Sequence, residues 1–321
     1  MISLNEAHEI FLNSHSSAEI LRAHDIPVGD IEKLTPTIRI SLEKALNEVD
    51  MTRDDILALT DISIENVAVL MSVSNFLRDK HKGTLISFSK NFFIPLTQLC
   101  RDKCSYCTFK YEPGEGELFY SPEKVLEAAK KSAELGCTEM LFVSGDKPEL
   151  VYDVYRKELN KMGYDSTSDY MIAMSEICLE EGIFPHSNLG IAKPEELKRF
   201  KNSNPSMGLM LESISERLME PGEAHYRCPD KYPRARIKTI SDAGKLNIPW
   251  TSGILIGIGE TWEERVDSIF ELKRISDEFR HIQEIIIQNF SPKPGIKMEG
   301  SPVPTDLDMI KTVAIAKILM G

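Results

Sequence analysis

Three cysteines lie close together about one third of the way along the chain. Cys100, Cys104 and Cys107 occur in the stretch LCRDKCSYCTF, with the spacing C-x3-C-x2-C. Thiolates grouped in this way are typical ligands of iron–sulfur clusters. Because no fourth ligand is evident nearby, the triplet predicts a [4Fe-4S] cluster in which one iron has no protein ligand. Such an iron can bind a small molecule.

Other interpretations of the cysteines stay open. A structural zinc site requires four protein ligands, and neither His81 nor His186 lies at a customary spacing to complete one. Buried cysteines that are neighbours by chance are a further alternative. Cys137, Cys178 and Cys228 are far apart in the chain, which does not indicate a disulfide framework in a reducing cytosol. We favour the cluster because the triplet follows an expected first strand.

The stretch FVSGDKPE, residues 142–149, follows the second expected strand. Gly145 permits close approach of another backbone or of a ligand. Asp146 and Glu149 add carboxylate acceptors for a cationic group. A glycine and an aspartate shortly before a proline also form ordinary turns, so a purely structural interpretation is equally open.

The third, fourth and fifth expected strands also end in candidate binding residues. Asn188 ends the third strand in PHSNLG, and Glu212 ends the fourth in LMLES. A carboxylate at Glu212 can accept hydrogen bonds from two hydroxyl groups, and a solvated charge is the alternative. Gly253 and Ile256 belong to GILIGIGE on the fifth strand, where glycine backbone and apolar side chains can flank a flat base or simply pack a buried strand.

The elements that position these residues change character along the chain. Residues 1–83 show apolar residues at helical spacing and predict a helical N-terminal extension. From residue 84 to 321, short apolar runs alternate with helical patterns, which is typical of parallel βα units. The six expected strands cover residues 85–96, 139–143, 183–189, 208–211, 248–256 and 284–289.

Consecutive parallel strands with right-handed crossovers predict an α/β fold, a TIM-like partial barrel of about six βα units. Such barrels carry their chemistry at the carboxyl ends of the strands, where the cysteines lie. The chain ends inside an apolar helical pattern, which we interpret as a barrel domain truncated at its C-terminus.

The composition excludes some classes of function. The chain has 321 residues, of which 42% are hydrophobic and 27% charged, and a formal net charge of -12. A negative surface disfavours nucleic acid and anionic membrane surfaces as partners. No secretory signal or membrane-spanning apolar run can be read from the sequence. We therefore expect a cytoplasmic protein.

The cysteine spacing, with the aromatic Tyr106 directly before the third cysteine, resembles the radical S-adenosyl-L-methionine (radical SAM) superfamily. The resemblance implies the radical SAM type of partial barrel, with SAM bound to the open iron and cleaved to methionine and a 5'-deoxyadenosyl radical. It implies cofactor contacts from the methionine-binding loop, the ribose-binding carboxylate and the adenine-binding strand. The residues concerned are Tyr106, Gly145, Asp146, Glu149, Asn188, Glu212, Gly253 and Ile256.

Longer stretches resemble a narrower family, CofG, the 7,8-didemethyl-8-hydroxy-5-deazariboflavin synthase subunits. They include ISFSKNFFIPLTQLCRDKCSYCTF, HYRCPDK and EIIIQNFSPKPGIKM. The resemblance implies a lyase of coenzyme F-420 biosynthesis that cyclises the tyrosine-derived adduct 5-amino-5-(4-hydroxybenzyl)-6-(D-ribitylimino)-5,6-dihydrouracil with release of ammonia. It further implies the adduct-forming subunit CofH as a functional partner and an electron donor such as ferredoxin or flavodoxin.

Two other functions stay open at this point. One is another radical SAM synthase, such as CofH itself or an aminofutalosine-type enzyme. The other is a non-catalytic iron–sulfur electron carrier, which would ligate every iron through the protein. For the CofG-like function, Gln288, Asn289, His225 and Arg227 are predicted to face the adduct. The sequence identifies no catalytic acid or base.

Overall fold

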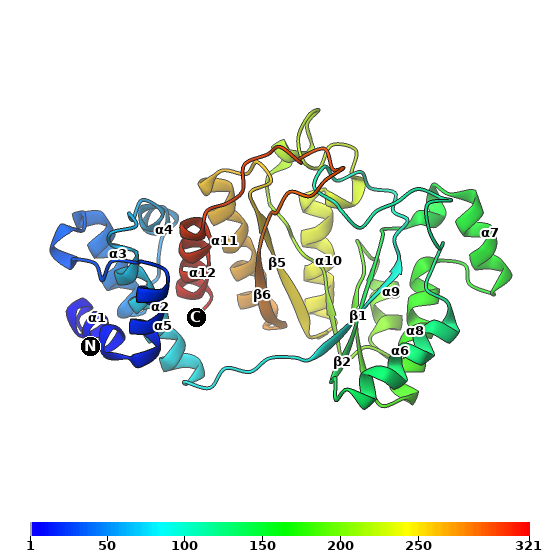
Figure 1. Cartoon of the computed structure of the whole chain (residues 1–321), viewed down its shortest axis with the longest axis horizontal. Helices are drawn as coiled ribbons and strands as arrows, with labels where there is room; N and C mark the ends of the chain where they lie inside the picture. The colour runs from blue at the N-terminus through cyan, green and yellow to red at the C-terminus, as the bar shows by residue number, and fades with distance from the viewer. Residues whose placement is uncertain (1) are drawn as a thin grey trace. The chain divides into compact units, whose positions relative to one another are not determined.

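A computed structural model describes residues 2–321, and the chain forms two compact units (Figure 1). The larger unit contains residues 87–259 and 274–301. The smaller unit contains the N-terminal segment up to Ile86, together with residues 260–273 and 302–321. The predicted division into residues 1–83 and 84–321 differs from this grouping, because residues 260–273 and 302–321 group with the N-terminal helices.

A parallel sheet of six strands forms the framework of the larger unit (Figure 1). The strands follow one another across the sheet in chain order, and each pairs in parallel with the next. This order confirms the predicted α/β partial barrel. The strands are β1 (Asn91–Thr97), β2 (Glu139–Ser144), β3 (Phe184–Asn188), β4 (Ser206–Gly208), β5 (Trp250–Ile256) and β6 (Ile282–Asn289).

Helices connect the successive strands. The first, α6, begins as predicted: the Ser121 hydroxyl accepts a hydrogen bond from the Lys124 amide at 3.4 Å, and Pro122 occupies the first turn. Gly136 follows the helix in a left-handed conformation, with φ of 67°, as is common after a helix end. The connecting helices are α6 (Pro122–Glu134), α7 (Asp153–Lys161), α8 (Thr167–Glu180), α9 (Pro194–Phe200), α10 (Pro233–Lys245) and α11 (Trp262–Phe279).

The strand boundaries differ from expectation at two places. The first strand was expected from Leu85, but β1 begins at Asn91, and Leu85 and Phe88 are 86% and 88% exposed. Apolar residues before β1 therefore do not signal a strand. The fourth strand was expected over residues 208–211, but β4 ends at Gly208, and only a single bridge joins Glu212 to Ile254 further along.

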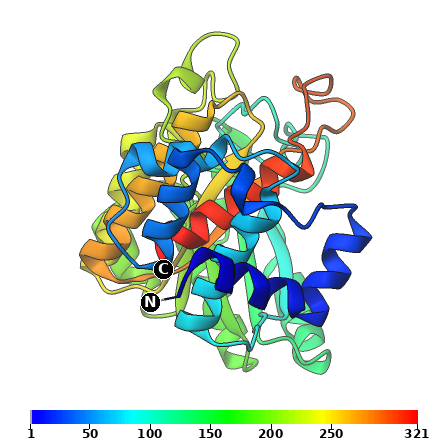
Figure 2. The ribbon, with the colours of Figure 1, turned by 90° about the vertical axis from the view of Figure 1, so that its left-hand side faces the viewer.

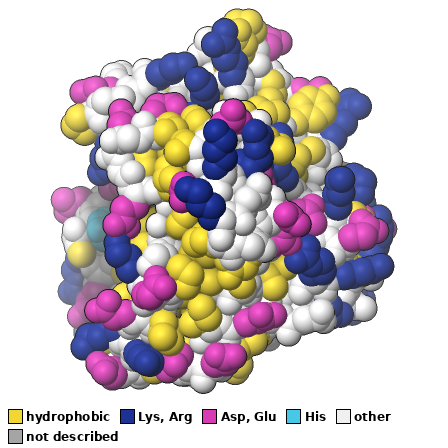
Figure 3. Space-filling view, turned by 90° about the vertical axis from the view of Figure 1, so that its right-hand side faces the viewer, with side chains coloured by type: hydrophobic (Ala, Val, Ile, Leu, Met, Phe, Trp, Pro, Cys, Tyr) yellow, Lys and Arg dark blue, Asp and Glu magenta, His cyan; other side chains and the backbone are white. Residues whose placement is uncertain are grey.

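The strand β5 is buried along its whole length, which is typical of a parallel strand covered on both faces. The outside of the larger unit is mixed in character. Figure 3 shows hydrophobic side chains among basic and acidic groups on the face that includes α7. This face therefore offers no uniformly basic surface to a nucleic-acid backbone.

The smaller unit is helical, as predicted for the N-terminal residues. Its C-terminal helix α12 (Asp306–Met320) packs against α5 (Val67–Lys82), and Figure 2 shows α12 in red beside the blue and cyan helices. The remaining helices of this unit are α1 (Leu4–Asn13), α2 (His15–Ala23), α3 (Pro36–Leu46) and α4 (Arg53–Thr60). Among the helices of residues 2–321, none combines the length and the apolar character needed to cross a bilayer.

Candidate iron–sulfur site

The three clustered cysteines lie in the loop that directly follows β1, which we call the cysteine loop (residues 98–109). The Cys107 amide donates a hydrogen bond to the Cys104 carbonyl at 3.1 Å, which forms a tight turn between them. Cys100, Cys104 and Cys107 are partly buried, and none forms a disulfide. Three unpaired thiols on one loop at the carboxyl end of a parallel strand fit the donor set of an iron–sulfur cluster.

The loop after β2, residues 144–149, packs directly on the cysteine loop, and we call it the glycine loop. The Gly145 amide donates to the Thr97 carbonyl at 2.8 Å, and the Arg101 amide donates to the Asp146 carbonyl at 3.0 Å. A Cβ atom on Gly145 would lie only 1.8 Å from the Leu99 carbonyl oxygen. Gly145 is therefore required because the cysteine loop occupies the space of a side chain.

The glycine loop also touches a candidate ligand atom. The Asp146 amide donates a hydrogen bond to the Cys100 sulfur at 3.1 Å. Burial raises the pKa of the Cys100 thiol to about 12, and the nearby negative charge of Asp102 adds to this effect. A cation such as iron would offset this cost of ionisation by binding the thiolate directly.

A second segment, residues 224–231, holds the cysteine loop by different contacts, and we call it the clasp segment. The Ser105 amide donates to the Ala224 carbonyl at 2.9 Å. The Tyr106 hydroxyl lies 3.0 Å from His225 Nε2, and the two rings meet edge to face with centroids 5.6 Å apart. His225 is 1% exposed, so it supports Tyr106 and is not open to a large substrate, contrary to its predicted place facing the adduct.

Buried charges join the two loops and the clasp segment. Asp102, Asp146 and Asp230 place carboxylate oxygens within 4.8 Å of one another. Arg101 forms two hydrogen bonds with Asp230, and Lys147 Nζ lies 3.3 Å from Asp146 Oδ1 and 3.7 Å from Asp230 Oδ1. Burial, with the neighbouring carboxylates, raises the pKa of Asp102 to about 6. The two cations therefore offset the repulsion among the three carboxylates.

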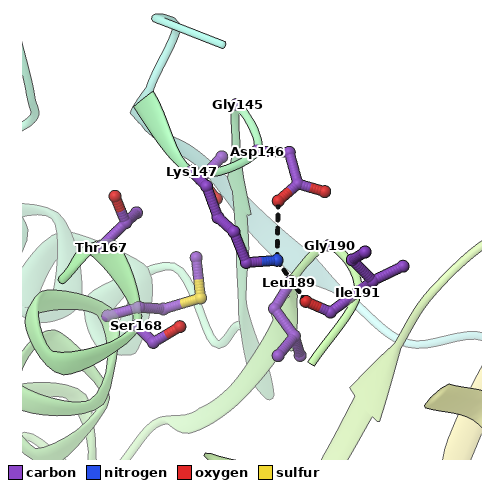
Figure 4. A pocket seen from close by; sticks show the side chains of 10 residues that line it. Gly145, Asp146, Lys147, Thr167, Ser168, Leu189, Gly190 and Ile191 are labelled. Carbon is purple, nitrogen blue, oxygen red and sulfur yellow. Dashed lines mark hydrogen bonds and ion pairs between the residues drawn. The ribbon is translucent and has the colours of Figure 1, made fainter. Parts of the chain in front are cut away.

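Figure 4 shows how Asp146 is held. The Lys147 ammonium reaches both the Asp146 carboxylate and the Ile191 carbonyl. A Cβ atom on Gly190 would lie 1.7 Å from Asp146 Oδ2, so the carboxylate lies against bare backbone of the loop after β3. The predicted site residue Asp146 is thus fixed between two strand ends beside the cysteine loop.

Glu149, a further predicted contact, has a different local role. Its carboxylate accepts hydrogen bonds from the Thr167 hydroxyl at 2.6 Å and from the Thr167 amide at 3.3 Å. These bonds anchor the first turn of α8. Both oxygens of Glu149 are therefore engaged within the protein, and a cofactor contact from this residue stays a prediction.

Two predicted residues present buried acceptor atoms without a hydrogen-bond partner among the described residues, namely Asn188 Oδ1 and Glu212 Oε2. Buried polar atoms are rarely left unpaired unless a ligand or water completes them. Gly208 stands opposite Asn188, where a Cβ atom would lie 2.1 Å from the amide oxygen. These two acceptors suit a ligand that carries hydroxyl or amino donors.

Glu212 is the more constrained of these two residues. It adopts a left-handed backbone conformation with φ of 66°, which is uncommon outside glycine. Burial opposes its ionisation, but the charges of Lys231 and Arg236 outweigh burial and hold the pKa of Glu212 below its usual value. Its other oxygen accepts a hydrogen bond from Lys231 at 2.6 Å. Glu212 is therefore an ionised acceptor.

The predicted residues of β5 have a packing role. A Cβ atom on Gly253 would lie 2.0 Å from the Ile286 carbonyl oxygen of the neighbouring strand β6. The Ile256 side chain is fully buried, and its carbonyl accepts a hydrogen bond from the Phe290 amide at 2.8 Å. Sheet packing thus accounts for both residues, and their contact with an adenine base stays a prediction.

Sequence reasoning missed the clasp segment as a support of the cysteine loop. The stretch HYRCPDK was taken as a likeness and as the source of two predicted substrate residues, His225 and Arg227. In the structure its Asp230 binds Arg101 of the cysteine loop, and its Lys231 binds Glu212. Two other predicted substrate residues, Gln288 and Asn289, are exposed at the end of β6. No local pattern marks Asp230, because its partner Arg101 is 129 positions away.

Comparison with known proteins identifies related sequences. Residues 94–272 match the Radical SAM superfamily. The chain is 47% identical over 238 residues to the 7,8-didemethyl-8-hydroxy-5-deazariboflavin synthase of Methanopyrus kandleri, which covers 74% of this chain and 71% of the relative. It is 50% identical over 234 residues to the protein of the same name from Methanothermobacter thermautotrophicus, covering 73% and 70%.

A longer relative is also found. The FO synthase of Streptomyces coelicolor is 41% identical over 307 residues, which are 92% of this chain but 35% of that protein. The chain therefore spans about a third of its length.

Solved structures show the same fold. The maturase HydG of the [FeFe]-hydrogenase aligns with a TM-score of 0.72 at 17% identity, covering 97% of this chain and 65% of that chain. Methylornithine synthase, PylB, aligns with a TM-score of 0.68 at 18% identity, covering 87% and 76%. At these identities the likeness concerns the fold alone.

Proposed function

Because the chain belongs to the radical SAM superfamily, and within it to the 7,8-didemethyl-8-hydroxy-5-deazariboflavin synthases, we propose that it closes the deazaflavin ring. The substrate is the tyrosine-derived ribityl diaminouracil adduct, and ammonia is released as the ring forms. The observation that carries this proposal is the 47% identity over 238 residues to a synthase of that name. The reaction starts from radical chemistry, as the superfamily implies.

Radical SAM enzymes use a [4Fe-4S] cluster and SAM, and the residues present fit both. Cys100, Cys104 and Cys107 would hold the cluster, which together with SAM supplies a 5'-deoxyadenosyl radical when both are bound. The Asp146 amide, 3.1 Å from the Cys100 sulfur, steadies the first of these ligands. The carboxylate network around Arg101 and Lys147 keeps the cysteine loop in place beside the glycine loop.

The SAM molecule brings hydroxyl and ammonium donors, and this part of the larger unit offers acceptors for them. Asn188 Oδ1 and Glu212 Oε2 are both buried and have no hydrogen-bond partner among the described residues. We propose that Glu212 binds the ribose hydroxyls and that Asn188 contacts the same cofactor. The backbone of the glycine loop, with Asp146, would receive the amino group of the methionine moiety.

The partner proposal follows from relative length. The FO synthase of Streptomyces coelicolor contains nearly twice as much further sequence as the part that this chain matches. We propose that a separate protein, CofH, makes the adduct on which this chain acts. An electron donor such as ferredoxin or flavodoxin would reduce the cluster. The free cysteines suit a reducing cytoplasm.

The decisive experiment is an anaerobic assay after reconstitution with iron and sulfide. The protein is reduced with dithionite and given SAM, with and without the adduct, and 5'-deoxyadenosine, ammonia and deazaflavin fluorescence are measured. We expect all three products with the adduct, and none with Cys104→Ala. Formation of 5'-deoxyadenosine without a fluorescent product would support radical SAM chemistry but would contradict the proposed substrate.

A further inference from the structure

Three hydrophobic residues are exposed directly after the glycine loop, and we call them the α7 patch. Leu150 ends a short 3-10 helix, Val151 follows it, and Val154 lies in the first turn of α7. They are 57%, 54% and 44% exposed, and Figure 3 shows hydrophobic side chains on the face that includes α7. Single exposed apolar residues are ordinary in soluble proteins, but a group of them often marks a contact surface.

The α7 patch lies next to the cysteine loop. Tyr152, within the same segment, places its hydroxyl 3.4 Å from the Cys100 carbonyl oxygen and 2.8 Å from Glu112 Oε2. The glycine loop, which leads into the patch, reaches the Cys100 sulfur through the Asp146 amide at 3.1 Å. Two short routes therefore join the patch to a predicted cluster ligand, and one of them ends on its sulfur.

The charged groups beside the α7 patch have a small excess of positive charge, although the whole chain carries a net charge of -12. Lys103 of the cysteine loop and Lys157 of α7 are exposed and form no ion pair with a described residue. Lys157 follows Val154 by three positions, so the two side chains are neighbours on the helix. Glu115, which accepts a hydrogen bond from the Glu112 amide at 2.7 Å, offsets one of these cations. The other charges here are paired, as Lys110–Glu112, Asp153–Arg156 and Glu158–Lys161.

We propose that the α7 patch is the docking surface of the electron donor, a flavodoxin, which reduces the cluster from the Cys100 side of the cysteine loop. A flavodoxin exposes the apolar edge of its flavin within an acidic surface, which complements aliphatic side chains flanked by Lys103 and Lys157. The flavin hydroquinone loses one electron and the cluster gains it, and no covalent bond changes. A small patch suits a donor that must leave after each transfer, since electron-transfer encounters bury less surface than stable complexes. The inference rests on the proposed radical chemistry and names the surface that its electron donor uses.

The test compares two reductants on the full chain after anaerobic reconstitution with iron and sulfide. Formation of 5'-deoxyadenosine from SAM is measured with flavodoxin hydroquinone as the only reductant, over a range of flavodoxin concentrations, and separately with dithionite. The variants are Leu150→Asp, Val154→Asp and Lys157→Glu, and iron content is measured for each. Leu135→Asp is the matched control, because Leu135 is 48% exposed and lies between α6 and the amino end of β2, away from the cysteine loop.

We expect Leu150→Asp and Val154→Asp to raise the half-saturating flavodoxin concentration about tenfold without lowering the maximal rate. Lys157→Glu should raise it about threefold at low salt, and this difference should shrink at high salt. Dithionite-driven cleavage and iron content should be unchanged in every variant, because the α7 patch does not hold the cluster or SAM. Leu135→Asp should match the unaltered protein with both reductants.

The outcomes separate the docking surface from the proposed function. Equal flavodoxin dependence in Leu150→Asp, Val154→Asp and the unaltered protein, with dithionite-driven cleavage intact, would overturn the docking surface and leave the radical chemistry in place. If the unaltered protein cleaved SAM with neither reductant, the proposed function would fail and this inference with it. A loss of deazaflavin in Leu150→Asp only when CofH supplies the adduct, with flavodoxin dependence unchanged, would assign the patch to CofH and reject the electron donor.

Discussion

The glycine loop and the clasp segment both hold the cysteine loop, but by different means. The glycine loop approaches with its backbone, so that the Gly145 position has no room even for a methyl group. The clasp segment uses the side chains of His225 and Asp230. The first kind of contact depends on the absence of a side chain, and the second on its chemical identity. Substitutions should therefore damage the two regions by different amounts and under different conditions.

The largest effect is expected at the backbone contact. In Gly145→Ala, the added methyl group would meet the Leu99 carbonyl at 1.8 Å, and the cysteine loop must move away. We expect a loss of about 3 kcal/mol of stability and a severe loss of cluster content after reconstitution. Urea unfolding of the metal-free protein and iron analysis measure these changes.

Gly300→Ala is the matched control, because a Cβ atom there meets nothing within 4 Å. Its stability should stay within about 0.5 kcal/mol of the unaltered protein. If Gly145→Ala is as stable as Gly300→Ala and binds four irons, the backbone contact does not shape the site.

A smaller loss of stability is expected when the carboxylate of Asp230 in the clasp segment is neutralised. Asp230 is fully buried, and Asp230→Asn leaves Arg101 without its ionic partner. Because the Arg101 side chain is 20% exposed, water offsets part of the cost, and we expect about 2 kcal/mol of destabilisation. Unfolding in urea at low and at high salt provides the measurement.

Asp153→Asn serves as the exposed control, since the Asp153 side chain is 74% exposed in its pair with Arg156. This pair should contribute well under about 1 kcal/mol. Equal losses in Asp230→Asn and Asp153→Asn would mean that the buried pair adds nothing specific to the clasp segment.

The smallest effect concerns His225 and depends on pH. Burial lowers the pKa of His225 from 6.5 to about 3, so the folded state keeps the ring neutral where the unfolded chain binds a proton. The stability supplied by this difference is present above pH 6.5 and is lost as the pH falls toward about 3. At pH 5.5 the loss amounts to about 1.4 kcal/mol.

His225→Phe removes this titration along with the hydrogen bond to Tyr106. Near pH 7.5 we expect a cost of about 1 kcal/mol or less, and a flatter dependence of stability on pH between 7 and 5. His15→Phe is the control, because the side chain of His15 is 86% exposed. An unchanged pH dependence in His225→Phe would show that His225 has the same pKa in the folded protein as in the unfolded chain.

Local patterns in the sequence determined the framework of this protein. The alternation of apolar runs and helical segments was enough for the parallel order from β1 to β6, because each βα unit is encoded within a short stretch. The C-x3-C-x2-C spacing was enough to predict the cluster ligands for the same reason, since all three thiols lie on one loop. The boundaries of β1 and β4 could not be predicted from the sequence, because they depend on how far each strand pairs with its neighbours.

Only the tertiary structure decided what surrounds the cysteine loop. Glu149 and Asp146 are close in sequence, yet one anchors α8 and the other lies beside Cys100. Asp230 seemed isolated in the sequence and binds Arg101 in the fold. Such contacts join segments more than 100 residues apart, and their partners are set by how the strand ends converge, which no local periodicity records.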